Sequence, residues 1–173
     1  MNKKLKEFLK KHENDLRQNN LYALYRDPSF PEGLTDDLIR MGLNPIDFVG
    51  KSIPPYFAKN CLLTKIDIPE DIKVIDMYAF YGCLNLKKIV IPEGVKIIGK
   101  YAFANCVRLT DIYLPSTIEF FGDKCFEGLQ YPEIHYNGSG SDLININGVY
   151  NITPNIRVDC NEAAYMNINE IES

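Results

Sequence analysis

The chain of 173 residues has no tryptophan, only two histidines and no Cys-x-x-C pair among its five cysteines. It also has no run of about 18 apolar residues, so no membrane-spanning helix is predicted. After Lys3 and Lys4, charged residues continue at Lys6, Glu7, Lys10 and Lys11 where a signal peptide would become apolar, so no export signal is predicted. An odd number of cysteines without such a signal indicates reduced thiols, and we expect a cytoplasmic protein.

The chain also lacks a basic patch. The net charge is −4, and the acidic excess lies after residue 136, where Arg157 is the single basic residue against five acids. Nucleic-acid binding depends on clustered Lys and Arg that neutralise phosphates. We therefore expect no nucleic-acid partner and no membrane partner.

A repeated pattern fills the middle of the sequence. The strand-like segments 66–69, 89–92 and 112–115 begin with Ile, end with Pro and recur every 23 residues. The pairs Ala79-Phe80, Ala102-Phe103 and Cys125-Phe126 follow at the same interval, and Phe57 lies one such interval before Phe80. A period of 20–50 residues indicates a solenoid, whose units bury their apolar faces only against their neighbours.

One repeat, residues 86–106, shows how each coil is built. The pattern L-x-x-I-x-I predicts a strand with alternate residues pointing inward, and Pro92 ends it because proline cannot donate to a ladder. Val95 and Ile98 predict a second short extended piece, Gly99 turns the chain, and Tyr101 begins an expected short helical or 3₁₀ segment. Equal spacing predicts that the strands stack into a parallel ladder.

This pattern, Leu-x-x-Ile-x-Ile-Pro-x-x-Val-x-x-Ile-Gly-x-x-Ala-Phe-x-x-Cys, resembles the BspA-like class of leucine-rich repeats over about residues 53–136. The resemblance implies a curved solenoid that binds other macromolecules, with no catalytic residues and no cofactor. Small members of this kind are also encoded by bacteriophages. The pattern departs from the family at Asn60 and Leu129, which we align with Cys83 and Cys106, and the strand beginning at Ile134 arrives one residue early.

We therefore predict an α+β solenoid with three parts: an N-terminal helical cap at 1–52, a leucine-rich repeat solenoid at 53–136 and a C-terminal capping segment at 137–173. Residues 3–25 have the apolar spacing of an amphipathic helix, and Thr35 is expected to cap a second one. In the C-terminal segment we expect short strands between 143 and 152, a last strand at 155–160 and a closing helix at 162–166. The helical cap either only covers the end of the core or also contacts a partner.

Two rows of outward side chains on the strand face are the candidate binding residues. The charged row runs from basic to acidic, and the aromatic row has an apolar and aromatic centre. The charged row is Lys65, Lys88, Asp111 and Glu133, and the aromatic row is Asp67, Val90, Tyr113 and His135. An exposed tyrosine among such neighbours is typical of a protein interface. The alternative is an ordinary solvated strand face.

The sequence gives little support for a catalytic site or a metal site. Cys83 and Cys106 are expected to fill the inner corner of successive coils as small apolar groups. No third ligand accompanies them for zinc, and no motif supports a Cys125–His135 nucleophile pair. We therefore expect no metal and no enzyme activity.

The sequence thus favours a protein-binding module that acts by occupying its partner. A phage-encoded inhibitor of a host defence protein is a narrower form of this hypothesis, and a surface adhesion or structural repeat module is the alternative. The identity of the partner and the oligomeric state stay open.

Overall fold

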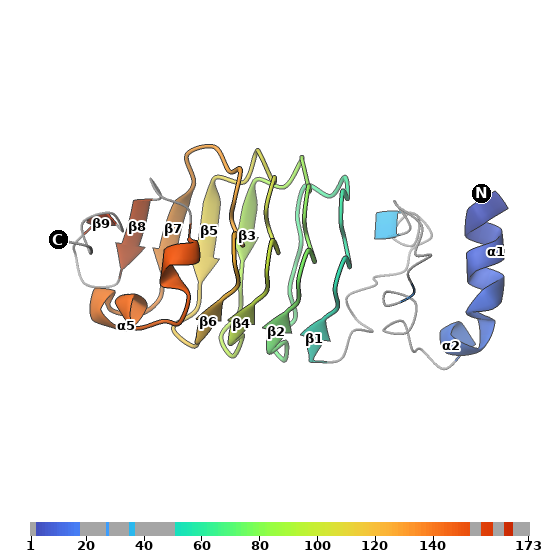
Figure 1. Cartoon of the computed structure of the whole chain (residues 1–173), viewed down its shortest axis with the longest axis horizontal. Helices are drawn as coiled ribbons and strands as arrows, with labels where there is room; N and C mark the ends of the chain where they lie inside the picture. Colours follow the sequence, from blue (N-terminus) through green and yellow to red (C-terminus); the bar gives the residue numbers. More distant parts are fainter. Residues whose placement is uncertain are drawn as a thin grey trace.

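The computed structural model describes residues 3–17, 27, 35–36, 51–152, 157–160 and 165–167. Figure 1 shows successive coils stacked side by side, with α1 at the N-terminal end and β8 and β9 at the other. The coils that begin at β2, β4 and β6 each contribute one short strand, one longer strand and a run of turns, whereas the first coil has an isolated bridge at Asp67 in place of the longer strand. The predicted solenoid is confirmed.

The short-strand sheet has four parallel strands in the order β1-β2-β4-β6. Its strands are β1 (Ser52–Ile53), β2 (Val74–Ile75), β4 (Ile97–Ile98) and β6 (Phe120–Phe121). The second residue of each strand is buried and the first points outward, as the alternation of a strand requires. These strands are the second extended piece predicted for each repeat.

The long-strand sheet has five strands in the order β3-β5-β7-β8-β9. Its members are β3 (Lys88–Val90), β5 (Asp111–Leu114), β7 (Glu133–Tyr136), β8 (Arg157–Cys160) and β9 (Tyr165–Asn167). The first four pair in parallel, and β9 pairs antiparallel to β8. The parallel ladder therefore continues past residue 136, and the boundaries at 52 and 136 stay predictions.

The third side of each coil is made of turns, so the expected helical or 3₁₀ segment at Tyr101 is wrong. Along this side alternate N–H groups bond within the coil and to the next coil. Tyr78 N donates to Lys100 O at 2.9 Å, whereas Ala79 N donates to Asp76 O three residues back. This alternation needs a residue with left-handed backbone at the same place in each coil. Tyr56, Tyr78, Tyr101 and Lys124 hold φ values of 60°, 55°, 54° and 55° there.

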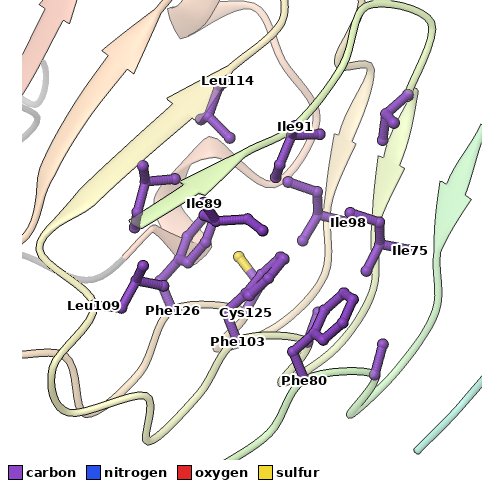
Figure 2. Close-up of a cluster of buried hydrophobic side chains, with 14 of the residues drawn as sticks. Ile75, Phe80, Ile89, Ile91, Ile98, Phe103, Leu109, Leu114, Cys125 and Phe126 are labelled. Atoms are coloured by element: carbon purple, nitrogen blue, oxygen red, sulfur yellow. The ribbon is translucent and has the colours of Figure 1, made fainter. Parts of the chain in front are cut away.

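The core lies between these three sides. Phe80, Phe103 and Phe126 stack along it with ring centroids 5.1 and 5.6 Å apart. Figure 2 shows these rings beneath Ile89 and Ile91 of the long-strand side and beside Ile75 and Ile98 of the short-strand sheet. The named side chains are at most 3% exposed. Burying a side chain of this size stabilises the fold by roughly 1.5–3 kcal/mol.

The first coil is one residue shorter than the sequence spacing indicated. Ser52 pairs with Val74 and Ile53 with Ile75, a step of 22, whereas Val74 pairs with Ile97, a step of 23. Leu63 follows Cys61 by two positions, whereas in the next two coils the corresponding leucine follows its cysteine by three positions.

This shorter step corrects two alignments. Asn60 does not replace a repeat cysteine, because Cys61 occupies that position. Phe57 does not align with Phe80, because Ala58 N makes the cross-coil bond that Phe80 N makes one coil later.

The N-terminal part has two helices, α1 (Lys3–Lys11) and α2 (Glu13–Arg17), so the predicted helix at 3–25 breaks at His12. His12 is buried, and its two ring nitrogens lie 3.0 Å from Asp15 Oδ2 and 2.7 Å from Asp27 Oδ2. Thr35 donates its hydroxyl proton to the carbonyl of Phe57 in the first coil. The rest of the predicted helical cap lies outside the described residues.

The C-terminal segment contains helices where strands were expected. Ser139 caps α5 (Gly140–Ile144) in a capping box with Asp142, and η2 (Val149–Asn151) follows. Phe121 N donates to Asn147 O at 2.9 Å, so this segment covers the last short strand. The predicted last strand is confirmed as β8. The predicted closing helix is wrong, because its last two residues belong to β9, while 161–164 lie outside the described residues.

Candidate functional site

The charged row forms along the long-strand sheet. Lys88 is in register with Asp111, and Asp111 with Glu133. All three residues point outward, because they alternate with the buried isoleucines of their strands. Lys65 lies before the first bridge of this ladder, where its Nζ is 2.9 Å from Asp67 Oδ1 of the same coil.

The aromatic row forms one step further along the same strands. Asp67 bridges to Val90, Val90 is in register with Tyr113, and Tyr113 with His135. The ladder then continues to Asp159 of β8, which sequence reasoning did not include because the spacing changes after residue 136. The structure therefore brings together Lys88, Asp111 and Glu133 of the charged row and all four members of the aromatic row, and it lengthens the aromatic row.

Tyr113 lies at the centre of this face. The Lys88 Nζ is 4.3 Å from the centroid of its ring, and the His135 ring stacks on it with centroids 4.3 Å apart and planes 21° from parallel. His135 Nδ1 lies 3.6 Å from Asp159 Oδ2, while its Nε2 is buried and has no hydrogen-bond partner among the described residues. Val90, the next member of the row, is 52% exposed. The centre is thus an aromatic group held by its neighbours beside an exposed apolar side chain.

A groove of about 480 Å³ runs beside the aromatic row, where the long strands end. It is lined by Val90, Tyr113 and His135 of that row and by residues that follow each strand. Among the latter, Glu93 accepts hydrogen bonds from Asn137 Nδ2 at 2.7 Å and from Ser116 N at 3.2 Å. Sequence reasoning missed this contact, since 44 residues separate Glu93 from Asn137 and no local pattern links them.

A second outward row lies on the short-strand sheet and was also missed. Val74, Ile97 and Phe120 are in register, and Ile97 and Phe120 are 37% and 43% exposed. The 23-residue spacing was a sufficient signal, because these residues immediately precede the buried residue of each short strand. This apolar row is a second exposed surface, on which a control substitution for the long-strand face can be placed.

A tyrosine column stands on the turn side. The rings of Tyr56, Tyr78 and Tyr101 stack with centroids 5.2 and 5.0 Å apart. Lys124 takes the same place in the next coil, with its Nζ 6.0 Å from the centroid of the Tyr101 ring. These contacts join neighbouring coils, and they fix the side chains of the left-handed residues.

The cysteines are buried structural groups. Cys83 Sγ donates to Ala58 O and Cys106 Sγ to Phe80 O, both at 3.1 Å. Hydrogen bonding with the thiols of Cys106 and Cys61, together with burial, raises the pKa of Cys83, and burial raises that of Cys125. These two thiols therefore stay protonated, and a protonated thiol is a poor nucleophile and metal ligand.

The described part of the chain contains no group of three or more His, Cys, Asp or Glu that could hold a metal ion. No described helix is long and apolar enough to cross a membrane.

A search of curated proteins found no match, and a search of solved structures found none either. The family model of the BspA-type leucine-rich repeat region matches residues 51–157 with six copies. Repeats of this class generally mediate protein–protein contact or adhesion, on a fold that is typically a non-catalytic binding scaffold. Because the match spans more than half of the sequence and agrees with the coils described above, the chain belongs to the BspA-type leucine-rich repeat family.

Proposed function

We propose that the chain is a non-enzymatic module that binds one partner protein through the long-strand sheet and acts by occupying the partner's surface. The observation that supports this most is the placement of Tyr113 between Lys88 and His135, at the centre of two outward rows. Tyrosine is favoured at the centre of interfaces because it combines a large apolar ring with a polar end.

The backbone beneath this face supports the proposal. The strands carrying Val90, Tyr113 and His135 are paired in register on both sides of Tyr113, over a fully buried layer of isoleucines. A binding surface that is ordered before contact loses less conformational entropy on association. Rigid coils that hold side chains at fixed spacing are therefore suited to recognising one complementary surface.

The experiment compares two variants in a capture assay from lysate of the native host. Tyr113→Ala removes the centre of the long-strand face, whereas Phe120→Ala removes an outward aromatic side chain from the short-strand sheet. We expect a stoichiometric partner that Tyr113→Ala loses and Phe120→Ala retains. The reverse pattern would move the binding site to the short-strand sheet and refute the proposal.

We also propose a narrower form, in which the module works in the cytoplasm and inhibits a host defence protein on behalf of a phage. What the resemblance adds in its support is that small chains of this kind also occur in bacteriophage genomes. Genes of phage structure or lysis beside this gene are the expected finding. Protease treatment of intact cells tests the adhesion alternative, because only a surface-exposed chain would be cleaved.

A further inference from the structure

The groove beside the aromatic row carries negative charge. Glu93 lies near one end of its lining and Asp159 on the last parallel strand that lines it. The described residues that line the groove include no Lys or Arg. Their basic group is the imidazole of His135. The charge of Lys88 is directed at the Tyr113 ring, and Lys88 is not part of the lining.

The Glu93 carboxylate is held in place. Asn137 Nδ2, Ser116 N and Ser116 Oγ donate to it at 2.7, 3.2 and 3.3 Å. Burial acts to raise the pKa of Glu93, but these hydrogen bonds and one from Thr117 outweigh it, and the pKa is lowered. A fixed, ionised carboxylate beside open space is a suitable acceptor for a cationic group.

The rest of the lining is apolar. Val90, Pro92 and Pro115 lie in the same groove, and Val90 is half exposed. The methylene stems of lysine and arginine pack on such surfaces while their charged ends reach polar partners. The groove therefore combines two features that suit basic side chains.

The spacing of the strands sets the spacing of the ligands. The groove extends from the coil of β3 to β8, but the Glu93 carboxylate lies between Ser116, which follows β5, and Asn137, which follows β7, so it is about two strand steps from β8. Parallel neighbours lie about 4.8 Å apart, so the two steps span roughly 10 Å. An extended peptide rises about 3.3 Å per residue, so it covers this span in about three residues.

We propose that this groove receives an extended segment of the partner protein that carries two basic side chains about three residues apart, one paired with Glu93 and the other with Asp159. An apolar residue between them packs on Val90 and the edge of Tyr113. The inference rests on the proposed function, whose site it narrows, and it names the chemistry of the partner.

The test uses the whole chain and a defined probe, the acetylated and amidated peptide Arg-Leu-Ala-Arg. Binding is followed through the backbone amide signals of Val90, Tyr113 and His135 in NMR titrations. Citrulline in place of both arginines keeps the shape and removes the charge. We expect the double variant Glu93→Gln/Asp159→Asn to weaken binding of the arginine peptide by roughly tenfold or more. The matched control Glu119→Gln, on the other sheet, should bind like the unmodified chain.

Equal binding of the citrulline peptide, a double variant that binds as well as the unmodified chain, or preference for a peptide with Glu at both ends would overturn the proposal. A wild-type chain that binds none of the peptides at millimolar concentration would overturn it too. None of these results bears on the Tyr113→Ala capture experiment, so the groove and the protein-binding function fail independently.

Discussion

Replacing Gly99 with alanine tests the close contact between neighbouring coils. A Cβ atom at Gly99 would lie 2.6 Å from Met77 N and 2.7 Å from the carbonyl carbon of Asp76, both in the backbone of the preceding coil. Ordinary contact begins at 3.4 Å, so the two coils must separate by about 0.8 Å. No side-chain rotation can relieve this overlap, since the atoms on both sides belong to the backbone.

The cost follows from two hydrogen bonds that flank the site. Gly99 N to Ile75 O is 2.7 Å and Tyr78 N to Lys100 O is 2.9 Å, and the separation would stretch them to about 3.5 and 3.7 Å. Each weakened bond costs roughly 0.5–1.5 kcal/mol, and more where its groups stay buried. The loss of chain entropy in the unfolded state returns about 0.4–1 kcal/mol. The two weakened bonds, less this return, leave an expected net loss of about 1–2 kcal/mol in the free energy of unfolding.

Urea unfolding followed by far-ultraviolet circular dichroism measures this loss. The matched control is Asp76→Ala, at the same place one coil earlier, where Asp76 N bonds to Ile53 O and a Cβ is already present. That control should lose at most about 1 kcal/mol, from its side-chain bond to Met77 N. A Gly99→Ala variant within 0.5 kcal/mol of the control would refute the argument from backbone contact.

Three further predictions concern the core, the groove and the N-terminal helices. Phe103→Ala should lower the free energy of unfolding by about 3–5 kcal/mol, because the fully buried ring stacks on both neighbouring coils, and thermal unfolding will show it. Because the pKa of Glu93 is lowered, its stabilising effect is complete above about pH 4.3 and is lost as the pH falls through the folded-state value. Asn137→Ala should therefore destabilise the chain more at pH 5 than at pH 3 in urea titrations, and an equal loss at both would contradict this. His12→Ala should cost about 1–3 kcal/mol by removing the imidazole contacts to Asp15 and Asp27, while Lys11 stays 2.6 Å from the Asp27 carboxylate, and the loss should be seen as faster amide exchange in α1; exchange unchanged from wild type would count against it.

The strand ladders could be predicted because their signals are local and repeated. Alternation around Ile89 and Ile112, together with the 23-residue period, indicates which residues point inward and which share a row. The same reasoning gave the one-residue change before Ile134, which the register confirms. It failed in the first coil, where a missing residue after Cys61 is invisible unless the cross-coil hydrogen bonds are known.

Other features depend on contacts that no local pattern displays. A left-handed tyrosine costs about 1–2 kcal/mol in isolation, so propensity argues against it at Tyr78 and Tyr101. Bonds to the next coil and ring stacking offset that cost. For α5 the signal was present, since Ser139 and Asp142 form a capping box, but a helix of five residues shows no apolar period.

The antiparallel strand β9 has a consequence for how such a chain can vary. A parallel ladder can accept another coil at any internal position, whereas β9 reverses direction and so forms a fixed end. Duplication of one 23-residue unit within the gene would lengthen both outward rows by one residue and leave that end unchanged. Recombination between repeats can therefore alter the length of the recognition surface in whole steps, without any new loop or cap having to evolve.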